Sequence, residues 1–182
     1  YLDRMFGSDN GDHVQAAFVK LAETYQHTGR TDRISSLVTD FLNRAPNPAK
    51  ARQLAVQVLQ RRGLYREAAT QIGRVREFQG NVMGFDLGAN LFRAGELEQA
   101  REAFRRHAEE SPYSGAVWLK IADFFEAHAH PDLAADAYDR SVEAAPDDFK
   151  PREARGRFRL LQGEIDAGMA DFRDALDRAS KK

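Results

Sequence analysis

The hydrophobic positions of this chain follow a pattern that returns at a nearly constant interval. In residues 115–148, one apolar stripe recurs at helical spacing, a break follows at His128–Pro131, and a second apolar stripe comes after it. The first stripe contains Trp118, Ile121, Ala122 and Phe125, and the second contains Leu133, Ala134, Ala137, Tyr138 and Val142. Apolar residues at such spacing lie on one face of a helix. The pattern therefore predicts two helices joined by a short turn.

Three series of residues keep this interval in phase. The predicted turn inside each unit has a small residue, at steps of 34, 32, 34 and 34: Gly29, Gly63, Gly95, Ala129 and Gly163. The predicted end of the unit carries Pro46, Gly80, Pro112 and Pro146, and the first helix carries Ala22, Val56, Gly88, Ala122 and Gly156. A repeat of this length is typical of a solenoid, in which each unit covers the apolar face of its neighbour.

The pattern divides the chain into five predicted units. They are residues 15–48, 49–80, 81–114, 115–148 and 149–182. The second unit is two residues short, around Phe78–Gly80. Residues 1–14 are expected to be either the last turns of a preceding helix or a disordered leader. We therefore expect ten helices in five antiparallel pairs, without a strand.

These units resemble the tetratricopeptide repeat (TPR) family from Gln15 to about Arg178. The family pattern of Trp, Leu-Gly, Tyr, Ala, Phe, Ala and Pro is matched by Trp118, Leu87, Gly88, Tyr25, Ala68, Ala100, Ala134, Phe104, Phe172, Ala175, Pro46, Pro112 and Pro146. The resemblance implies an all-α, right-handed superhelical solenoid. It also implies a concave face that is lined mainly by first helices and commonly holds a peptide or a partner helix.

If the chain follows this geometry, a partner-binding surface is expected on the concave face. Its residues would be Phe85, Phe92, Arg93, Leu119, Lys120, Asp123 and Arg157. Exposed aromatic side chains on such a face anchor the apolar side chains of a partner, and the polar groups around them fix its orientation. The alternative for Phe85 and Phe92 is packing between units, because aromatic stripes at helical spacing often belong to a core.

The fifth unit departs from the pattern. Arg152, Arg155 and Arg159 stand where the fourth unit has its large apolar side chains. Three guanidinium groups cannot lie unpaired in a dry helix contact. Either the helix is rotated, with Ala154, Phe158 and Leu161 facing inward, or the arginines lie along the end of the array with their charged heads in water. In the second case they form a solvated cap or a docking patch for an acidic partner.

Composition narrows the possible partners and chemistry. A net charge of −1, from 27 basic and 28 acidic side chains, gives no long-range attraction for nucleic acid or an anionic membrane. No apolar run approaches the roughly 20 residues of a membrane span. The chain has no cysteine, which excludes disulfides and cysteine-ligated zinc. His128 and His130, near Asp132 and Asp136, are the one constellation suited to a metal. Two histidines in an exposed turn, without a third ligand at fixed spacing, are a weak signal for a metal site.

We interpret the chain as an interaction scaffold for a protein or peptide, without enzymatic activity or a cofactor. Its Ala- and Arg-rich helices look bacterial, and the array resembles scaffold portions of envelope-assembly and exopolysaccharide-export proteins. The alternatives are a cytoplasmic regulatory adaptor and a metal-binding enzyme or sensor that uses His128 and His130. Self-association end to end is a further hypothesis, and the composition fits the cytoplasm and the bacterial periplasm equally.

Overall fold

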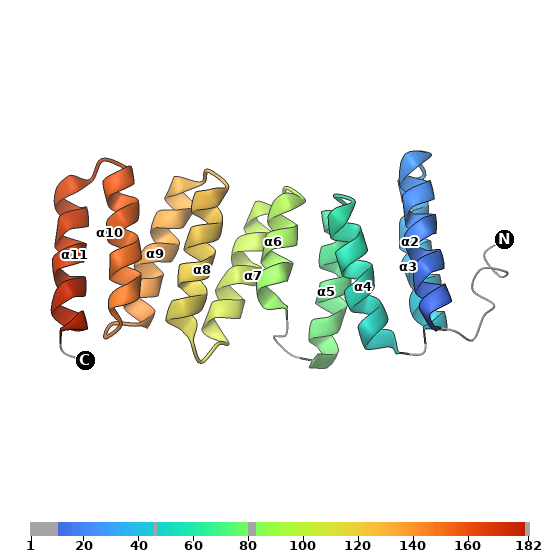
Figure 1. Cartoon of the computed structure of the whole chain (residues 1–182), viewed down its shortest axis with the longest axis horizontal. Helices are drawn as coiled ribbons and strands as arrows, with labels where there is room; N and C mark the ends of the chain where they lie inside the picture. Colours follow the sequence, from blue (N-terminus) through green and yellow to red (C-terminus); the bar gives the residue numbers. More distant parts are fainter. Residues whose placement is uncertain (1–10, 46, 80–82, 181–182) are drawn as a thin grey trace. The chain divides into compact units, whose positions relative to one another are not determined.

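The computed structural model describes residues 11–45, 47–79 and 83–180 (Figure 1). These residues form ten α-helices and one short 3-10 segment, Thr31–Arg33, and no strand occurs among them. The helices are α2 (Gly11–His27), α3 (Ile34–Arg44), α4 (Pro48–Arg61), α5 (Tyr65–Gln79), α6 (Gly84–Arg93), α7 (Leu97–Glu109), α8 (Ser114–Ala127), α9 (Pro131–Ala144), α10 (Phe149–Leu161) and α11 (Ile165–Ala179). The all-α fold class is confirmed.

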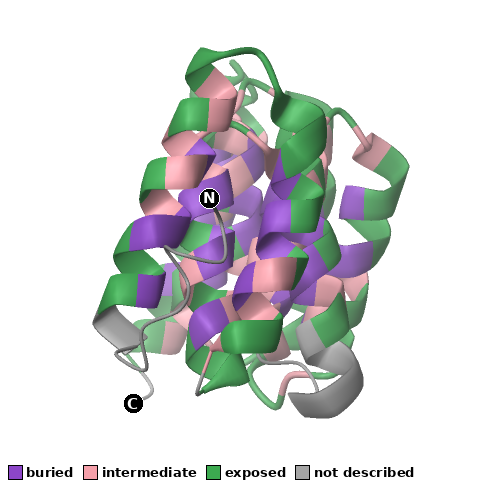
Figure 2. Cartoon of the chain, turned by 90° about the vertical axis from the view of Figure 1, so that its right-hand side faces the viewer, coloured by how far each residue is buried: buried purple, intermediate pink, exposed green. Residues whose placement is uncertain are grey.

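The chain divides into two compact units, with the boundary inside α7, between Ala103 and Phe104. In the first unit, α2 pairs with α3 and α4 pairs with α5, while α3 also contacts α4 and α5 contacts α6. Its core includes the stacked rings of Phe18 and Phe41, whose centroids are 4.3 Å apart. Figure 2 shows buried residues in stripes along the helices, with exposed residues on the opposite faces.

In the second unit, α8 pairs with α9 and α10 pairs with α11. The two hairpins are joined by the contact of α10 with both α9 and α8. Tyr138 of α9 and Phe158 of α10 meet with ring centroids 5.0 Å apart, and neither side chain is exposed. Phe104 packs against Phe124 and Phe125 of α8, with ring centroids 5.4 and 5.5 Å away. Each hairpin of this unit is thus covered by a neighbour.

The turn series has a conformational cause. Gly29, Gly63, Gly95 and Gly163 have φ values between 70° and 85°, and Ala129 has φ 59°. This left-handed region carries no steric cost for glycine but strains a residue with a Cβ atom. The period of small residues therefore marks the left-handed turn that closes each first helix.

The first-helix series marks close contacts between helices. Its members Ala22, Val56, Gly88, Ala122 and Gly156 are all buried. A Cβ atom added to Gly156 would lie 3.0 Å from the carbonyl oxygen of Gly168 on α11. A Cβ atom on Gly168 would lie 2.8 Å from Leu160 and 2.9 Å from the Gly156 oxygen. Helices α10 and α11 therefore meet with almost no space between their backbones.

The unit boundaries stay a prediction. Helix α2 begins at Gly11, four residues before the expected start of the array, and residues 1–10 lie outside the described part. Pro46 and Gly80 of the unit-end series also lie outside it. Helix α5 continues to Gln79, through part of the segment where the sequence is two residues short.

We expect Gly168→Ala to lower the free energy of unfolding by about 1–3 kcal/mol, because the added methyl group overpacks the α10–α11 contact. The matched control is Gly73→Ala in α5, where an added Cβ atom meets nothing within 4 Å. That change should be neutral or stabilising, by up to about 1 kcal/mol, because alanine favours the helix. Urea denaturation followed by circular dichroism measures both values. Equal effects at the two glycines would contradict the close contact.

Candidate partner-binding surface

Two carboxylates of α8 are held by one buried hydroxyl group. The Tyr138 side chain of α9 is fully buried, and its Oη lies 2.8 Å from Asp123 Oδ1 and 2.5 Å from Glu126 Oε2. A phenol has a single proton, so it donates to one carboxylate at a time. Asp123 and Glu126 are thereby fixed next to each other on the first-helix face, although their charges repel.

Burial raises the pKa of Tyr138 above its ordinary value, and hydrogen bonds to Glu126 and Asp123 raise it further. The hydroxyl therefore keeps its proton at neutral pH. Among the described side chains, no lysine or arginine forms an ion pair with Asp123 or Glu126. Asp123 is exposed and Glu126 is half-buried. Asp123 and Glu126 thus present two fixed negative charges that no cation of the described residues neutralises.

A cavity of about 360 Å³ opens beside Glu126. Its lining contains the buried ring of Phe158 together with Glu126, Ala129, Pro131 and Gln162. The wall is thus mainly apolar, with a carboxylate and an amide among its polar groups. Such a cavity suits a long side chain with an apolar stem and a positive end, since lysine and arginine bury their stems and keep their charges near polar groups.

The other predicted site residues of the second unit lie on the same first helices. Lys120 and Asp123 are exposed on α8, Leu119 is half-buried there, and Arg157 is exposed on α10. Asp123 and Arg157 are one full repeat apart and occupy equivalent positions on two first helices that contact each other. The face therefore carries charges of both signs.

In the first unit, the predicted site residues lie on α6. Phe85 and Phe92 are half-buried, and Arg93 is exposed with its guanidinium carbon 5.8 Å from the ring centre of Tyr65 on α5. This position of Arg93 fits a cation–π contact. The partner-binding role of these residues, and their convergence with those of α8 and α10, stay predictions.

Polar residues at the start of the array make internal contacts. Arg62 pairs with Glu23 of α2 at 2.5 Å, and the Gln26 amide nitrogen donates to the Arg62 carbonyl oxygen at 3.0 Å. These bonds link α2 to the end of α4.

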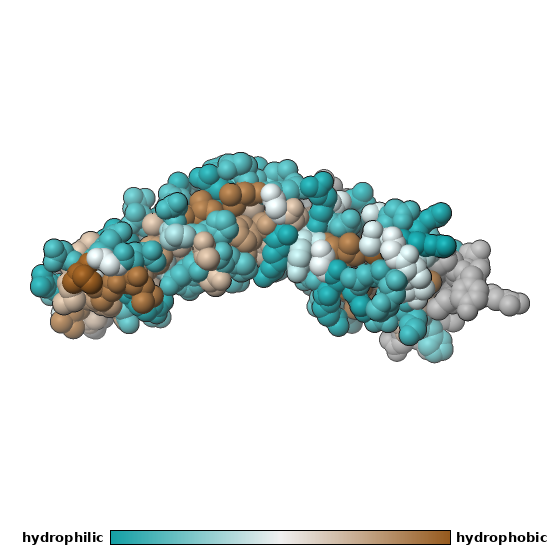
Figure 3. Space-filling view, turned by 90° about the horizontal axis from the view of Figure 1, so that it is seen from above, coloured by the Kyte–Doolittle hydropathy of each residue, from teal (hydrophilic) through white to brown (hydrophobic). Residues whose placement is uncertain are grey.

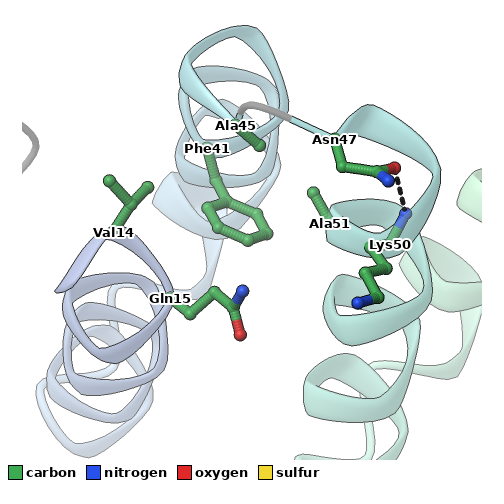
Figure 4. Close-up of a pocket in the computed structure, with 7 residues that line it drawn as sticks. All are labelled: Val14, Gln15, Phe41, Ala45, Asn47, Lys50 and Ala51. Carbon is green, nitrogen blue, oxygen red and sulfur yellow. Dashed lines mark hydrogen bonds between the residues drawn. The ribbon is translucent and has the colours of Figure 1, made fainter. Parts of the chain in front are cut away.

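At the opposite ends of these helices, a cavity of about 240 Å³ lies between α2, α3 and α4 (Figure 4). Phe41 lines its wall, and Asn47 beside it caps α4 by accepting a hydrogen bond from the Lys50 amide at 3.1 Å.

The arginines of the fifth unit form an internal ion-pair network. Arg155 binds Asp171 of α11 at 2.5 Å and Asp139 of α9 at 2.8 Å. Arg159 binds the same two aspartates at 2.9 and 3.3 Å. Asp171 is buried. The network therefore ties α10 to both neighbouring helices.

Arg152 completes this network by pairing with Asp174 of α11, and only 7% of Arg152 is exposed. The expectation of a solvated cap or a docking patch was therefore wrong, because aspartates of the neighbouring helices neutralise these arginines. The expectation of a rotated helix was right for Ala154 and Phe158, which are buried, and wrong for Leu161, which is 69% exposed.

The pKa values follow this pairing. Burial alone would lower the pKa of Arg155, but hydrogen bonds and the charges of Asp171 and Asp139 outweigh it and raise the pKa. Desolvation alone would raise the pKa of Asp174, but hydrogen bonds from Arg152 and Arg178 and their positive charges outweigh it and lower the pKa below its ordinary value. Both groups therefore stay charged at neutral pH, and the network holds α10 and α11 together.

The turn histidines make local contacts. His128 Nδ1 lies 2.7 Å from the Phe124 carbonyl oxygen, and the His128 ring packs on Phe124 with centroids 4.2 Å apart. Among the described residues, no three histidine, cysteine, aspartate or glutamate side chains form a group that could hold a metal ion. Within the same residues, no helix combines the length and apolar character that a membrane crossing requires.

Comparisons with known proteins agree with this architecture. No known family model matches the chain, and no curated protein matches it in sequence. The crystal structure of MamA superposes with a TM-score of 0.52 at 17% identity, covering 88% of this chain and 95% of that one. A putative kinesin light chain from Podosopora anserina, with nearly identical TPR-like repeats, gives 0.53 at 12% identity, covering 96% and 98%.

The chain has the TPR fold. The resemblance seen in the sequence is confirmed at the level of the fold. Sequence reasoning missed the acidic half of the TPR array's ion-pair network, Asp139, Asp171 and Asp174. A signal was present, because Asp171 and Asp174 are three residues apart on one predicted helix, next to a helix with arginines at similar spacing.

We expect Asp171→Asn to lower the free energy of unfolding by about 3 kcal/mol or more, because two partly buried arginines lose their shared carboxylate. Asp177→Asn is the matched control, since Asp177 is exposed on the same helix and the change should cost less than about 0.5 kcal/mol. Trp118 is the single tryptophan and belongs to the second unit, so its fluorescence reports the unfolding of that unit. Similar losses for both variants would contradict a structural role for the network.

Proposed function

We propose that this chain is a protein–protein interaction scaffold whose first helices bind a partner peptide or helix. The observation that carries this proposal is the pair of carboxylates, Asp123 and Glu126, held by the buried Tyr138 hydroxyl beside the cavity at Phe158. Groups that are already fixed lose little conformational entropy on binding, so they favour affinity and orientation. A positive side chain from the partner also relieves the repulsion between the two carboxylates.

The partner segment accordingly carries a lysine or arginine for Glu126 and Asp123. The stem of this side chain packs on Phe158 in the cavity, and its charge lies against the carboxylates. Acidic residues elsewhere in the segment suit Lys120 and Arg157, which are exposed on α8 and α10. The segment is therefore of mixed charge and has at least one long basic anchor.

For α6 we propose a second contribution, in which Phe85 and Phe92 provide apolar contact and Arg93 pairs with an acidic residue. The chain acts in this proposal without catalysis. A place in a larger envelope-assembly or exopolysaccharide-export protein is the biological setting we favour, on the basis of its Ala- and Arg-rich helices alone.

Selection from a displayed library of random peptides tests the proposal. We expect the enriched peptides to share a lysine or arginine, and Asp123→Lys to weaken their binding at least tenfold, because it places a cation beside the anchor. Glu143→Lys changes the charge equally on an exposed face of α9 and should leave affinity within about twofold. Phe92→Ala tests the α6 contribution separately, with an expected loss of tenfold or more.

Circular dichroism establishes that each variant is folded before affinity is compared. Equal weakening by Asp123→Lys and Glu143→Lys would show that net charge, and not this surface, governs binding. Enriched peptides without a basic residue would contradict the carboxylate pair as the anchor site.

A further inference from the structure

Helix α11 has an apolar stripe that is largely exposed. Ile165, Met169 and Leu176 are 57%, 43% and 70% exposed, and Leu161 at the end of α10 is 69% exposed. Phe172 is half-buried between them. Figure 3 shows hydrophobic atoms gathered over the end of the molecule formed by α10 and α11. Large apolar side chains grouped in this way mark an interaction surface.

The preceding hairpin shows how the array covers such a stripe. On α9, Tyr138 packs on Phe158 of α10, and Asp139 pairs with Arg155 and Arg159. The period of the repeat places Phe172 and Arg173 of α11 at the positions of Tyr138 and Asp139. The charge at this position is therefore reversed. A further helix with arginines at the positions that they occupy on α10 would place them against the positive charge of Arg173. Whatever covers this stripe must therefore place an acidic residue near Arg173.

Helix α11 itself offers that acid. Asp166 precedes Arg173 by seven residues, about two helical turns, and therefore lies on the same flank of the stripe. Both side chains are exposed, and within the described structure neither forms an ion pair. In an antiparallel helix pair, residues on the same flank face each other across the contact.

We propose that the occupant is a second copy of this chain, bound with its α11 antiparallel to the first. A twofold axis level with the midpoint between Ala170 and Asp171 places Met169 opposite Phe172 and Ile165 opposite Leu176 of the other copy. In this register Asp166 lies within two residues, about 3 Å along the helix axis, of the level of Arg173 of the other copy. This approach of opposite charges occurs twice, once on each side of the axis. The apolar stripe and the charges beside it are thus self-complementary, as a symmetric dimer requires.

Sedimentation equilibrium of the chain from about 1 µM to 1 mM tests this proposal. A contact of one helix pair is small, so we expect weak dimerisation in the wild type. Asp166→Arg alone and Arg173→Asp alone should each weaken it at least tenfold, because like charges then meet twice. An equimolar mixture of the two variants should recover dimerisation, since two arginines of one copy face two aspartates of the other.

The chain has no cysteine, so one introduced thiol reports the position of the axis. Under oxidation, Met169→Cys should form a covalent dimer much faster than Ser180→Cys, whose two thiols would be about 30 Å apart at 1.5 Å per residue. A wild type that stays monomeric at 1 mM, or a mixture of charge variants that dimerises no better than either alone, would overturn the proposal. Equal rates of cross-linking at the two positions would also overturn it.

Discussion

The structure depends on the close approach of the two helices of each hairpin, which small side chains permit. Gly115 of α8 lies so near α9 that an added Cβ atom would be 2.5 Å from that of Ala145, and the Ser141 hydroxyl donates to the Gly115 carbonyl oxygen at 2.8 Å. Gly156 and Gly168 bring α10 and α11 together in the same way. Since hairpins packed this tightly leave an apolar face outward, the next helix must cover it, and an array results.

In the second unit, the contact between α9 and α10 contains ion pairs, because Asp139 of α9 pairs with Arg155 and Arg159 of α10. Replacement of a buried ion-pair network by apolar residues often leaves stability unchanged or raises it, so the network is weak evidence for added stability. It does restrict what can dock, because Arg155 and Arg159 need an acid at the position of Asp139. The reversal of charge at Arg173 shows that the faces of successive units are not interchangeable. Charge thus determines which surface can follow which, while apolar contact provides most of the stabilisation.

The sequence predicted the helices well because one periodic pattern carried three independent signals. The φ values of Gly29 and Ala129 explain why the turn series consists of small residues. The pairing of the fifth-unit arginines was harder to predict. Arg155 forms ion pairs with Asp139 and Asp171, which lie on the helices before and after its own helix. The Tyr138 hydroxyl was likewise hidden, since its ring matches the apolar stripe and only the structure shows its contacts with two carboxylates.

Unfolding of a shortened chain tests most directly the claim that each hairpin is stabilised by its neighbour. Removal of residues 149–182 deletes α10 and α11, and it exposes the face of α9 that contains Tyr138. We expect Trp118 of the shortened chain to report unfolding at a clearly lower urea concentration than in the full chain, because α8 and α9 lose the helices that cover them. An unchanged unfolding midpoint would contradict this dependence on the neighbouring hairpin, since α8 and α9 would then be stable without α10 and α11.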